Sequence, residues 1–121
     1  MTLYPEKSQI EDLLNGPSDS PVVMINLLVF KDRSSYEKYQ LAVAKLLPEY
    51  GAKVVWAGEM RSTVIGKNVP AFETIYLVQY PNHKAFVDMT SSPAYLEDKI
   101  HREEGLESQW LLATTPDPMF Q

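Results

Sequence analysis

Asn26 and His101 are the residues of this sequence whose types and positions could do chemistry. Asn26 lies within an apolar run, residues 22–30, that predicts a buried strand. A buried side-chain amide without a partner costs about 2–7 kcal/mol, so Asn26 is either a ligand contact in a cavity or a structural amide bonded to its neighbours. His101 lies inside a predicted helix, where an imidazole could act as a general acid or base. We predict both residues as candidate catalytic groups.

The charged neighbours of His101 allow two interpretations. Glu97 precedes His101 by four residues and Asp98 precedes Arg102 by four, so each carboxylate would lie beside its partner on one helix face. A carboxylate beside His101 would orient the ring and favour its charged form, and Arg102 would contact a ligand. The alternative is a solvated helix face with two ordinary charge pairs. His83, at the start of another predicted helix, is expected to be exposed.

Four further residues are candidate ligand contacts. Tyr36 and Tyr76 have an apolar body and a polar tip that could line a pocket, although tyrosines at helical spacing are more often part of a core. Trp56 and Arg61 fall on opposite faces of one predicted strand, so they cannot line the same wall. Arg61 could bind a carboxylate ligand or pair with Glu59.

No motif predicts a cofactor or a metal. The chain has no cysteine, which excludes disulfides, thiolate nucleophiles and zinc–sulfur sites. Its two histidines are too far apart for a metal-binding motif, and there is no glycine-rich phosphate loop or Ser-His-Asp motif. We therefore predict no cofactor, so any catalysis would use side chains alone.

The composition of the chain limits the classes of partner that it is expected to bind. The chain has 121 residues, 45% of them hydrophobic and 22% charged, which is typical of one globular domain. The net charge of −5 disfavours nucleic acid, because an acidic surface repels phosphates. No apolar run reaches the roughly 20 residues that a membrane helix needs, and no signal peptide is visible. We expect no membrane contact and a cytoplasmic location.

The elements that must position these residues follow from hydrophobic periodicity and turn residues. We expect a short helix over 5–15, a strand over 21–30, a long helix from 34 to about 50 with a capping box from Ser34 to Glu37, strands over 52–65 and 72–80, a helix from 82 to about 90 that restarts at 92 and ends at 105, and a strand over 108–115. After an N-terminal helix and linker (1–20), residues 21–121 thus have the βαββαβ order of a ferredoxin-like α+β domain with a four-stranded antiparallel sheet.

The strand over 21–30 is apolar on both faces. In this architecture both helices cover one side of the sheet, so the second apolar face needs another cover. The same face of a second copy would provide it, which predicts a homodimer. The alternative is that the N-terminal helix and the C-terminal tail provide the cover.

An ordered set of short segments resembles a known family. The segments are Met24-Ile25-Asn26-Leu27-Leu28 with Phe30, Tyr36-Glu37-Lys38-Tyr39, Tyr50-Gly51-Ala52, Trp56-Ala57-Gly58, Tyr80-Pro81, Ser92-Pro93-Ala94-Tyr95, His101-Arg102 and Leu111-Leu112-Ala113-Thr114-Thr115. Over residues 21–116 the chain resembles the domain-of-unknown-function 1330 family of the dimeric α/β-barrel superfamily. The resemblance implies a ferredoxin-like protomer whose sheet pairs with that of a partner, and it implies no reaction.

Three functions remain open. The first is a homodimer that binds a small organic molecule near Asn26 and His101; superfamily analogy alone suggests a cofactor-free monooxygenase or isomerase. The second is a non-catalytic dimeric interaction module. The third is a relative of the haem-degrading monooxygenases of this superfamily, which use an asparagine, a tryptophan and a histidine; here Tyr76 stands where the tryptophan is expected.

Overall fold

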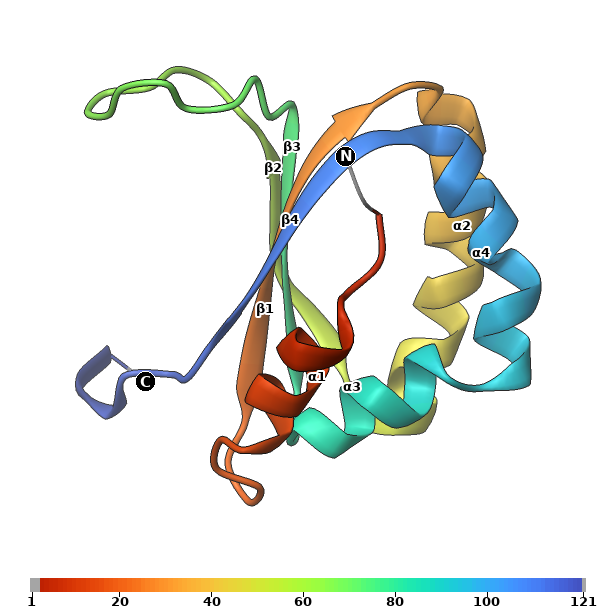
Figure 1. Ribbon diagram of the computed structural model, residues 1–121, viewed down its shortest axis with the longest axis vertical. Coiled ribbons are helices and arrows are strands. Elements are labelled where there is room, and N and C mark those ends of the chain that lie inside the picture. The colour runs from red at the N-terminus through yellow and green to blue at the C-terminus, as the bar shows by residue number, and fades with distance from the viewer. Residues whose placement is uncertain (1–2, 121) are drawn as a thin grey trace.

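The computed structural model describes residues 3–120, and its fold is α+β (Figure 1). Its elements in chain order are α1 (Lys7–Leu14), β1 (Val22–Phe30), α2 (Arg33–Leu46), the 3-10 helix η1 (Leu47–Tyr50), β2 (Lys53–Glu59), β3 (Thr74–Tyr80), α3 (His83–Thr90), α4 (Pro93–Gly105), β4 (Leu106–Thr114) and the 3-10 helix η2 (Pro118–Phe120). The strands form one sheet of order β2-β3-β1-β4 in which every pair is antiparallel. The predicted fold class and ferredoxin-like order are confirmed.

Several boundaries differ from the sequence prediction. The long helix begins after Asp32, whose carboxylate accepts hydrogen bonds from the backbone N–H groups of Ser34 and Ser35. Asp32 is therefore the N-cap in place of the predicted Ser34. Hydrogen bonds from the hydroxyls of Ser34 and Ser35, and then those from their backbone N–H groups, lower the pKa of Asp32. The second strand ends at Glu59 rather than at residue 65, and a long loop over residues 60–73 follows it.

The helices and the sheet meet at two separate clusters. One cluster lies near the start of β1, where Val22 and Met24 pack with Leu47 and Met89. The other lies near its end, where Leu28 packs with Tyr36 of α2 and with Leu106. Asn26 projects from the same face of β1 between Met24 and Leu28, so it lies between the two clusters.

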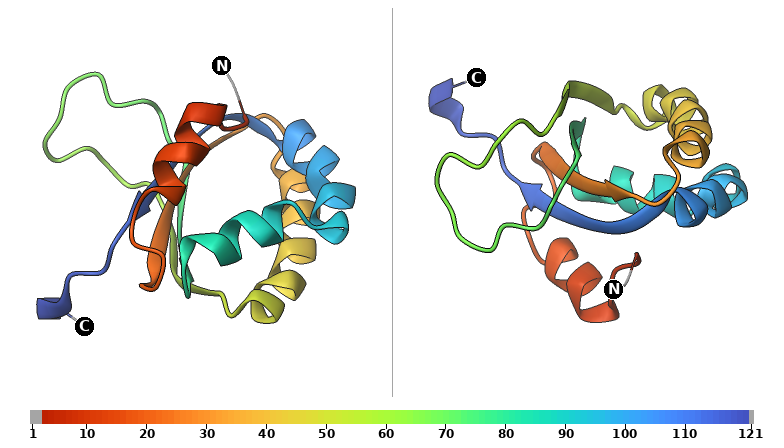
Figure 2. Two further views of the ribbon diagram at one scale, coloured as in Figure 1. Left: turned by 60° about the horizontal axis from the view of Figure 1, so that its bottom comes forward. Right: turned by 90° about the horizontal axis from the view of Figure 1, so that it is seen from above.

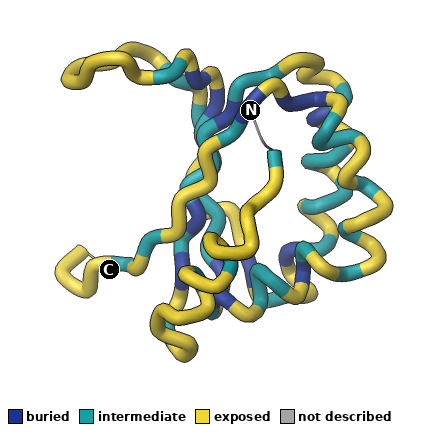
Figure 3. Tube along the Cα trace, in the orientation of Figure 1, coloured by how far each residue is buried: buried dark blue, intermediate teal, exposed yellow. Residues whose placement is uncertain are grey.

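The helices and the long loop lie on opposite sides of the sheet. Figures 1 and 2 show α2 and α4 on one side, with the loop over 60–73 and the C-terminal tail extending away on the other. Both extensions carry large apolar side chains in solvent: Val64, Ile65, Met119 and Phe120 are each at least 79% exposed. In Figure 3 most of the trace of both extensions is coloured as exposed.

The N-terminal helix α1 packs on its own chain. It contacts α3, and Leu13 packs against the first core cluster. Figure 2 shows α1 beside the β4 edge of the sheet. It therefore covers one flank of the helix–sheet interface, and it leaves the opposite face of the sheet uncovered.

Candidate functional site

A cavity of about 1320 Å³ separates the helices from the middle of the sheet and opens to solvent. The sheet contributes Asn26, Tyr76, Val78 and Gln109, and α2 contributes Tyr36, Tyr39, Gln40 and Val43. The remaining wall comes from α1, α3 and α4. The cavity lies between the two core clusters, at which buried apolar side chains of the described helices and sheet pack together.

A chain of hydrogen bonds between side chains crosses the cavity wall from α4 to the centre of the sheet. Arg102 of α4 donates from Nη2 to Oε1 of Gln109 on β4. Gln109 Nε2 donates to Asn26 Oδ1 at 3.0 Å, and Asn26 Nδ2 donates to the carbonyl oxygens of Tyr76 at 3.3 Å and Met24 at 3.4 Å. The Asn26 amide is thus satisfied by protein groups, as its structural interpretation requires, while its side chain lines the cavity.

The cavity is rich in tyrosines that stay protonated at neutral pH. Burial raises the pKa of Tyr36 and, well above its ordinary value, that of Tyr39. The hydroxyls of Tyr39 and Tyr95 are 2.7 Å apart and share a hydrogen bond. The tyrosine hydroxyls can donate or accept hydrogen bonds, and the raised pKa values keep Tyr36 and Tyr39 from acting as bases near pH 7.

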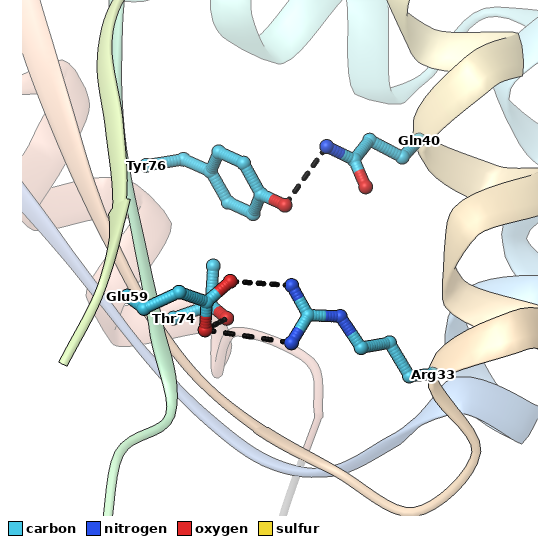
Figure 4. Close-up of polar contacts among 5 residues, drawn as sticks. All are labelled: Arg33, Gln40, Glu59, Thr74 and Tyr76. Atoms are coloured by element: carbon cyan, nitrogen blue, oxygen red, sulfur yellow. Dashed lines mark hydrogen bonds and ion pairs between the residues drawn. The ribbon is translucent and has the colours of Figure 1, made fainter.

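On the β2 side, polar side chains bridge the gap between helix and sheet (Figure 4). Arg33 at the start of α2 forms an ion pair with Glu59 at 2.5 Å, and Thr74 donates to the same carboxylate at 2.8 Å. About two turns further along α2, Gln40 Nε2 donates to the Tyr76 hydroxyl at 2.8 Å. Hydrogen bonds here take the place of apolar packing between the layers.

On the α1 side, Tyr4 covers two cations of α4. The guanidinium carbon of Arg102 lies 5.4 Å from the centre of the Tyr4 ring, and Lys99 Nζ lies 5.6 Å from it. The Tyr4 hydroxyl donates to Glu103. Tyr4, Lys99 and Arg102 all line the cavity, so this flank is where positive charge meets the apolar interior.

The structure divides the predicted site residues into two groups. Asn26, Tyr36, Tyr76 and Arg102 line the cavity. Trp56, Arg61 and His101 are not among the described residues that line it.

The position of Trp56 follows from a register shift. Val54 pairs with Val78, but Trp56 pairs with Leu77, so a bulge at Val55 places Val54 and Trp56 on opposite faces. Regular strand alternation without a bulge would place Val54 and Trp56 on one face. The Trp56 ring lies over Gly58, because a Cβ built there would be 2.4 Å from the indole. Arg61 is in the exposed loop and not in a strand.

The two histidines lie outside the described lining of the large cavity. Nδ1 of His101 is buried and, within residues 3–120, has no hydrogen-bond partner. His83 was expected to be exposed, but it is 7% exposed. Neither ring lines the large cavity in the described part of the chain, so the histidine that a haem-degrading site would need is missing from its described lining.

The predicted charge pairs on α4 do not form. Within the described residues no ion pair joins Glu97 to His101 or Asp98 to Arg102. Arg102 turns instead toward Gln109. Gln109 and Gln40 are site residues that sequence analysis missed: each is a polar residue inside an element, but its partner lies in a distant segment.

No group of His, Cys, Asp and Glu side chains in residues 3–120 could hold a metal ion. Over the same residues, no helix combines the length and the apolar character needed to cross a membrane.

Known structures share this fold. A protein of unknown function from Rhodopseudomonas palustris is 25% identical, with a TM-score of 0.87 over 95% of this chain and 96% of its own. SnoaB, a cofactor-independent oxygenase from Streptomyces nogalater, is 13% identical, with a TM-score of 0.57 over 81% and 94% of the two chains. A dimeric protein of unknown function from Bacteroides fragilis with a ferredoxin-like fold is 11% identical, with a TM-score of 0.56 over 83% and 100%. The last two likenesses show the fold alone.

The sequence comparison agrees with the resemblance seen in the residues. No curated protein matches the chain. The family described as a domain of unknown function, DUF1330, matches residues 21–115, which leaves α1 outside the match. The chain belongs to the DUF1330 family.

Proposed function

We propose that this protein binds a small, largely apolar organic molecule in the cavity between its helices and its sheet. The observation that carries the proposal is the cavity itself, which lies between two packed clusters and has in its wall a few hydrogen-bonded polar side chains, among them Arg102, Gln109 and Asn26. Ligand sites are typically apolar concavities with a few oriented polar groups. The volume of about 1320 Å³ exceeds the roughly 300–1,000 Å³ of ordinary ligand pockets, so a small ligand fits with room for water.

The lining supports binding more strongly than acid–base catalysis. Burial raises the pKa of Tyr36 and Tyr39, and neither histidine belongs to the described lining. The likeness to a cofactor-independent oxygenase is compatible with a cofactor-free enzyme, but a shared fold does not supply a reaction. We therefore propose ligand binding, with Asn26, Gln109 and Arg102 as the polar contacts of the ligand.

We further propose that the binding unit is a homodimer joined through the uncovered face of the sheet. By strand register, Ile25, Leu77, Trp110 and Leu112 share this face, and Trp56 lies beside Leu77. Trp56, Trp110 and Leu112 are each about half exposed: 52%, 47% and 46%. The two apolar extensions lie on the same side. A contiguous apolar surface of this kind typically marks an interface, and a dimeric protein shares the fold.

Binding is tested with N-phenyl-1-naphthylamine, a neutral dye whose fluorescence rises in apolar sites. We expect saturable binding to the purified protein. Val43→Trp, which adds bulk to the cavity wall, is expected to weaken binding at least about tenfold, since a cavity filled by protein leaves no room for the ring. Leu41→Trp is the matched control, because Leu41 lies on the same helix and is 69% exposed. Circular dichroism shows that each variant is folded. An absence of saturable binding, or equal binding by the Val43→Trp protein, would overturn the proposal.

A further inference from the structure

We infer that the ligand of this cavity is an anion, an aromatic or apolar monocarboxylate whose carboxylate lies against Arg102. This inference rests on the proposed ligand-binding function and adds the chemical class of the ligand. It comes from the positive charges of Arg102 and Lys99, which line the cavity beside its apolar side chains.

Arg102 is a partly buried cation that forms no ion pair with an acidic group of the described residues. Its guanidinium donates to the neutral Gln109 and lies against the Tyr4 ring. Within residues 3–120, no carboxylate oxygen lies within 4.0 Å of it, although the chain has 16 acidic residues for 11 basic ones. Taking a guanidinium out of water is costly unless an anion compensates for the lost hydration. An anionic ligand would supply that compensation.

Lys99 adds a second positive charge at the same place. Lys99 and Arg102 are three residues apart on α4, and both contact the same Tyr4 ring. Like charges at this helical spacing repel each other, and a bound anion would relieve the repulsion. The charge of Arg102 also opposes the rise in the pKa of Tyr36 and Tyr39, so its field reaches the cavity interior.

The acidic groups of this region do not neutralise the pair. Glu103 accepts a hydrogen bond from the Tyr4 hydroxyl. Asp12 of α1 lines the cavity, but it forms no ion pair with Lys99 or Arg102 in the described structure. Lys99 and Arg102 are thus cations that line the α4 end of the cavity without an ion pair in residues 3–120, although α4 also carries Glu97, Asp98, Glu103 and Glu104.

The geometry favours a carboxylate over a phosphate. Gln109 occupies one nitrogen of the guanidinium, Nη2, and the planar fork keeps further N–H donors that match a carboxylate. The sequence has no glycine-rich loop that would cradle a phosphate with backbone N–H groups. Beyond Arg102, the tyrosine rings and Val43 and Val78 form an apolar and aromatic wall for the body of the ligand.

The test uses two probes of the same shape, 2-naphthoate and the neutral 2-naphthamide. Their affinities are measured by calorimetry and by displacement of N-phenyl-1-naphthylamine. We expect 2-naphthoate to bind about 10- to 100-fold more tightly, which is the factor for a hydrogen bond to a charged group. Arg102→Met should remove this preference, and Arg102→Lys should restore part of it. Arg61→Met is the matched control, since Arg61 is exposed and lies outside the described lining.

The outcomes separate this inference from the proposed function. If the dye binds but the naphthoate shows no preference over the amide in the unmodified protein, the ligand is not selected as an anion and the inference is overturned while the cavity function stands. Equal loss of preference in the Arg61→Met and Arg102→Met proteins would also overturn it. If neither the dye nor either probe binds, the proposed function itself fails. The preference in the unmodified protein decides the question even where Arg102→Met does not fold.

Discussion

The two faces of the sheet are both apolar, yet the protein uses them differently. The face toward the helices is covered, but it packs tightly only near the two ends of β1 and encloses a cavity between them. The opposite face carries Trp56, Trp110 and Leu112, half exposed, with two apolar extensions on the same side. An apolar face therefore shows that a cover is needed. It does not show what the cover is, or whether the cover packs against it without gaps.

Leu28→Ala is expected to have the largest effect, because it tests the packed part of the helix-side face. Leu28 is fully buried in the second core cluster. Replacing a buried leucine with alanine leaves a cavity and costs about 2–5 kcal/mol. We expect that loss in the free energy of unfolding, measured by urea denaturation at a fixed protein concentration.

The matched control is Leu41→Ala on the outer surface of α2, where the side chain is 69% exposed. A surface substitution of this kind changes stability by less than about 0.5 kcal/mol. Equal losses for Leu28→Ala and Leu41→Ala would contradict the placement of the core.

Leu112→Arg tests the uncovered face. Leu112 pairs with Ile25 on that face and is 46% exposed in one chain. In the proposed dimer, the substitution buries an unpaired charge in each copy, which costs about 3–5 kcal/mol and weakens association at least about 100-fold. We expect the unmodified protein to elute with the mass of two chains and the variant with the mass of one, by size-exclusion chromatography with light scattering.

Leu41→Arg controls for the added charge, since it makes the same change on the helix side. The circular dichroism spectrum of both variants should match that of the unmodified protein. A variant at Leu112 that remains dimeric, or an unmodified protein that is monomeric at micromolar concentration, contradicts the proposed interface.

Much of this comparison could be predicted from the sequence, because periodicity and turn residues are local signals. Element order, fold class and the unusual position of Asn26 followed from residues 21–30 and the segments after them. The predictions that were wrong depended on pairing between strands that are distant in the sequence. The bulge beside Val54 reverses the faces of β2, and only the pairing with β3 reveals it.

The same limit applies to the site. Gln109 bonds Asn26 across 83 residues of chain, and no local pattern gives that register. The sequence predicts His101 as a candidate because it is a histidine with Glu97 four residues before it. The rotation of α4 instead directs Arg102 into the cavity and leaves His101 out of the described lining. Side chains one residue apart on a helix point about 100° apart, so a small error in helix rotation exchanges one candidate for the other.

The smallest expected effect is a change in the pH dependence of stability on replacing Glu59, which bonds to Arg33 and Thr74 between the helix and the sheet. Arg33 and Thr74 bind the Glu59 carboxylate, and hydrogen bonds from Arg33 and then Thr74 lower its pKa below the ordinary value of 4.5. A carboxylate whose pKa is lower in the folded protein stabilises it above the unfolded pKa, and this contribution is lost as the pH falls through the folded pKa. We expect the stability of the unmodified protein to fall more steeply below about pH 4.5 than that of Glu59→Gln, measured by urea denaturation from pH 3 to pH 6. Both side chains of the ion pair are about half exposed, 46% for Arg33 and 58% for Glu59, so solvent keeps the difference in stability small.

The matched control is Glu49→Gln, which removes an exposed carboxylate that forms no ion pair in residues 3–120. It should leave the slope of stability against pH unchanged. Parallel pH profiles for the unmodified and Glu59→Gln proteins would show that these contacts of Glu59 do not stabilise the folded protein.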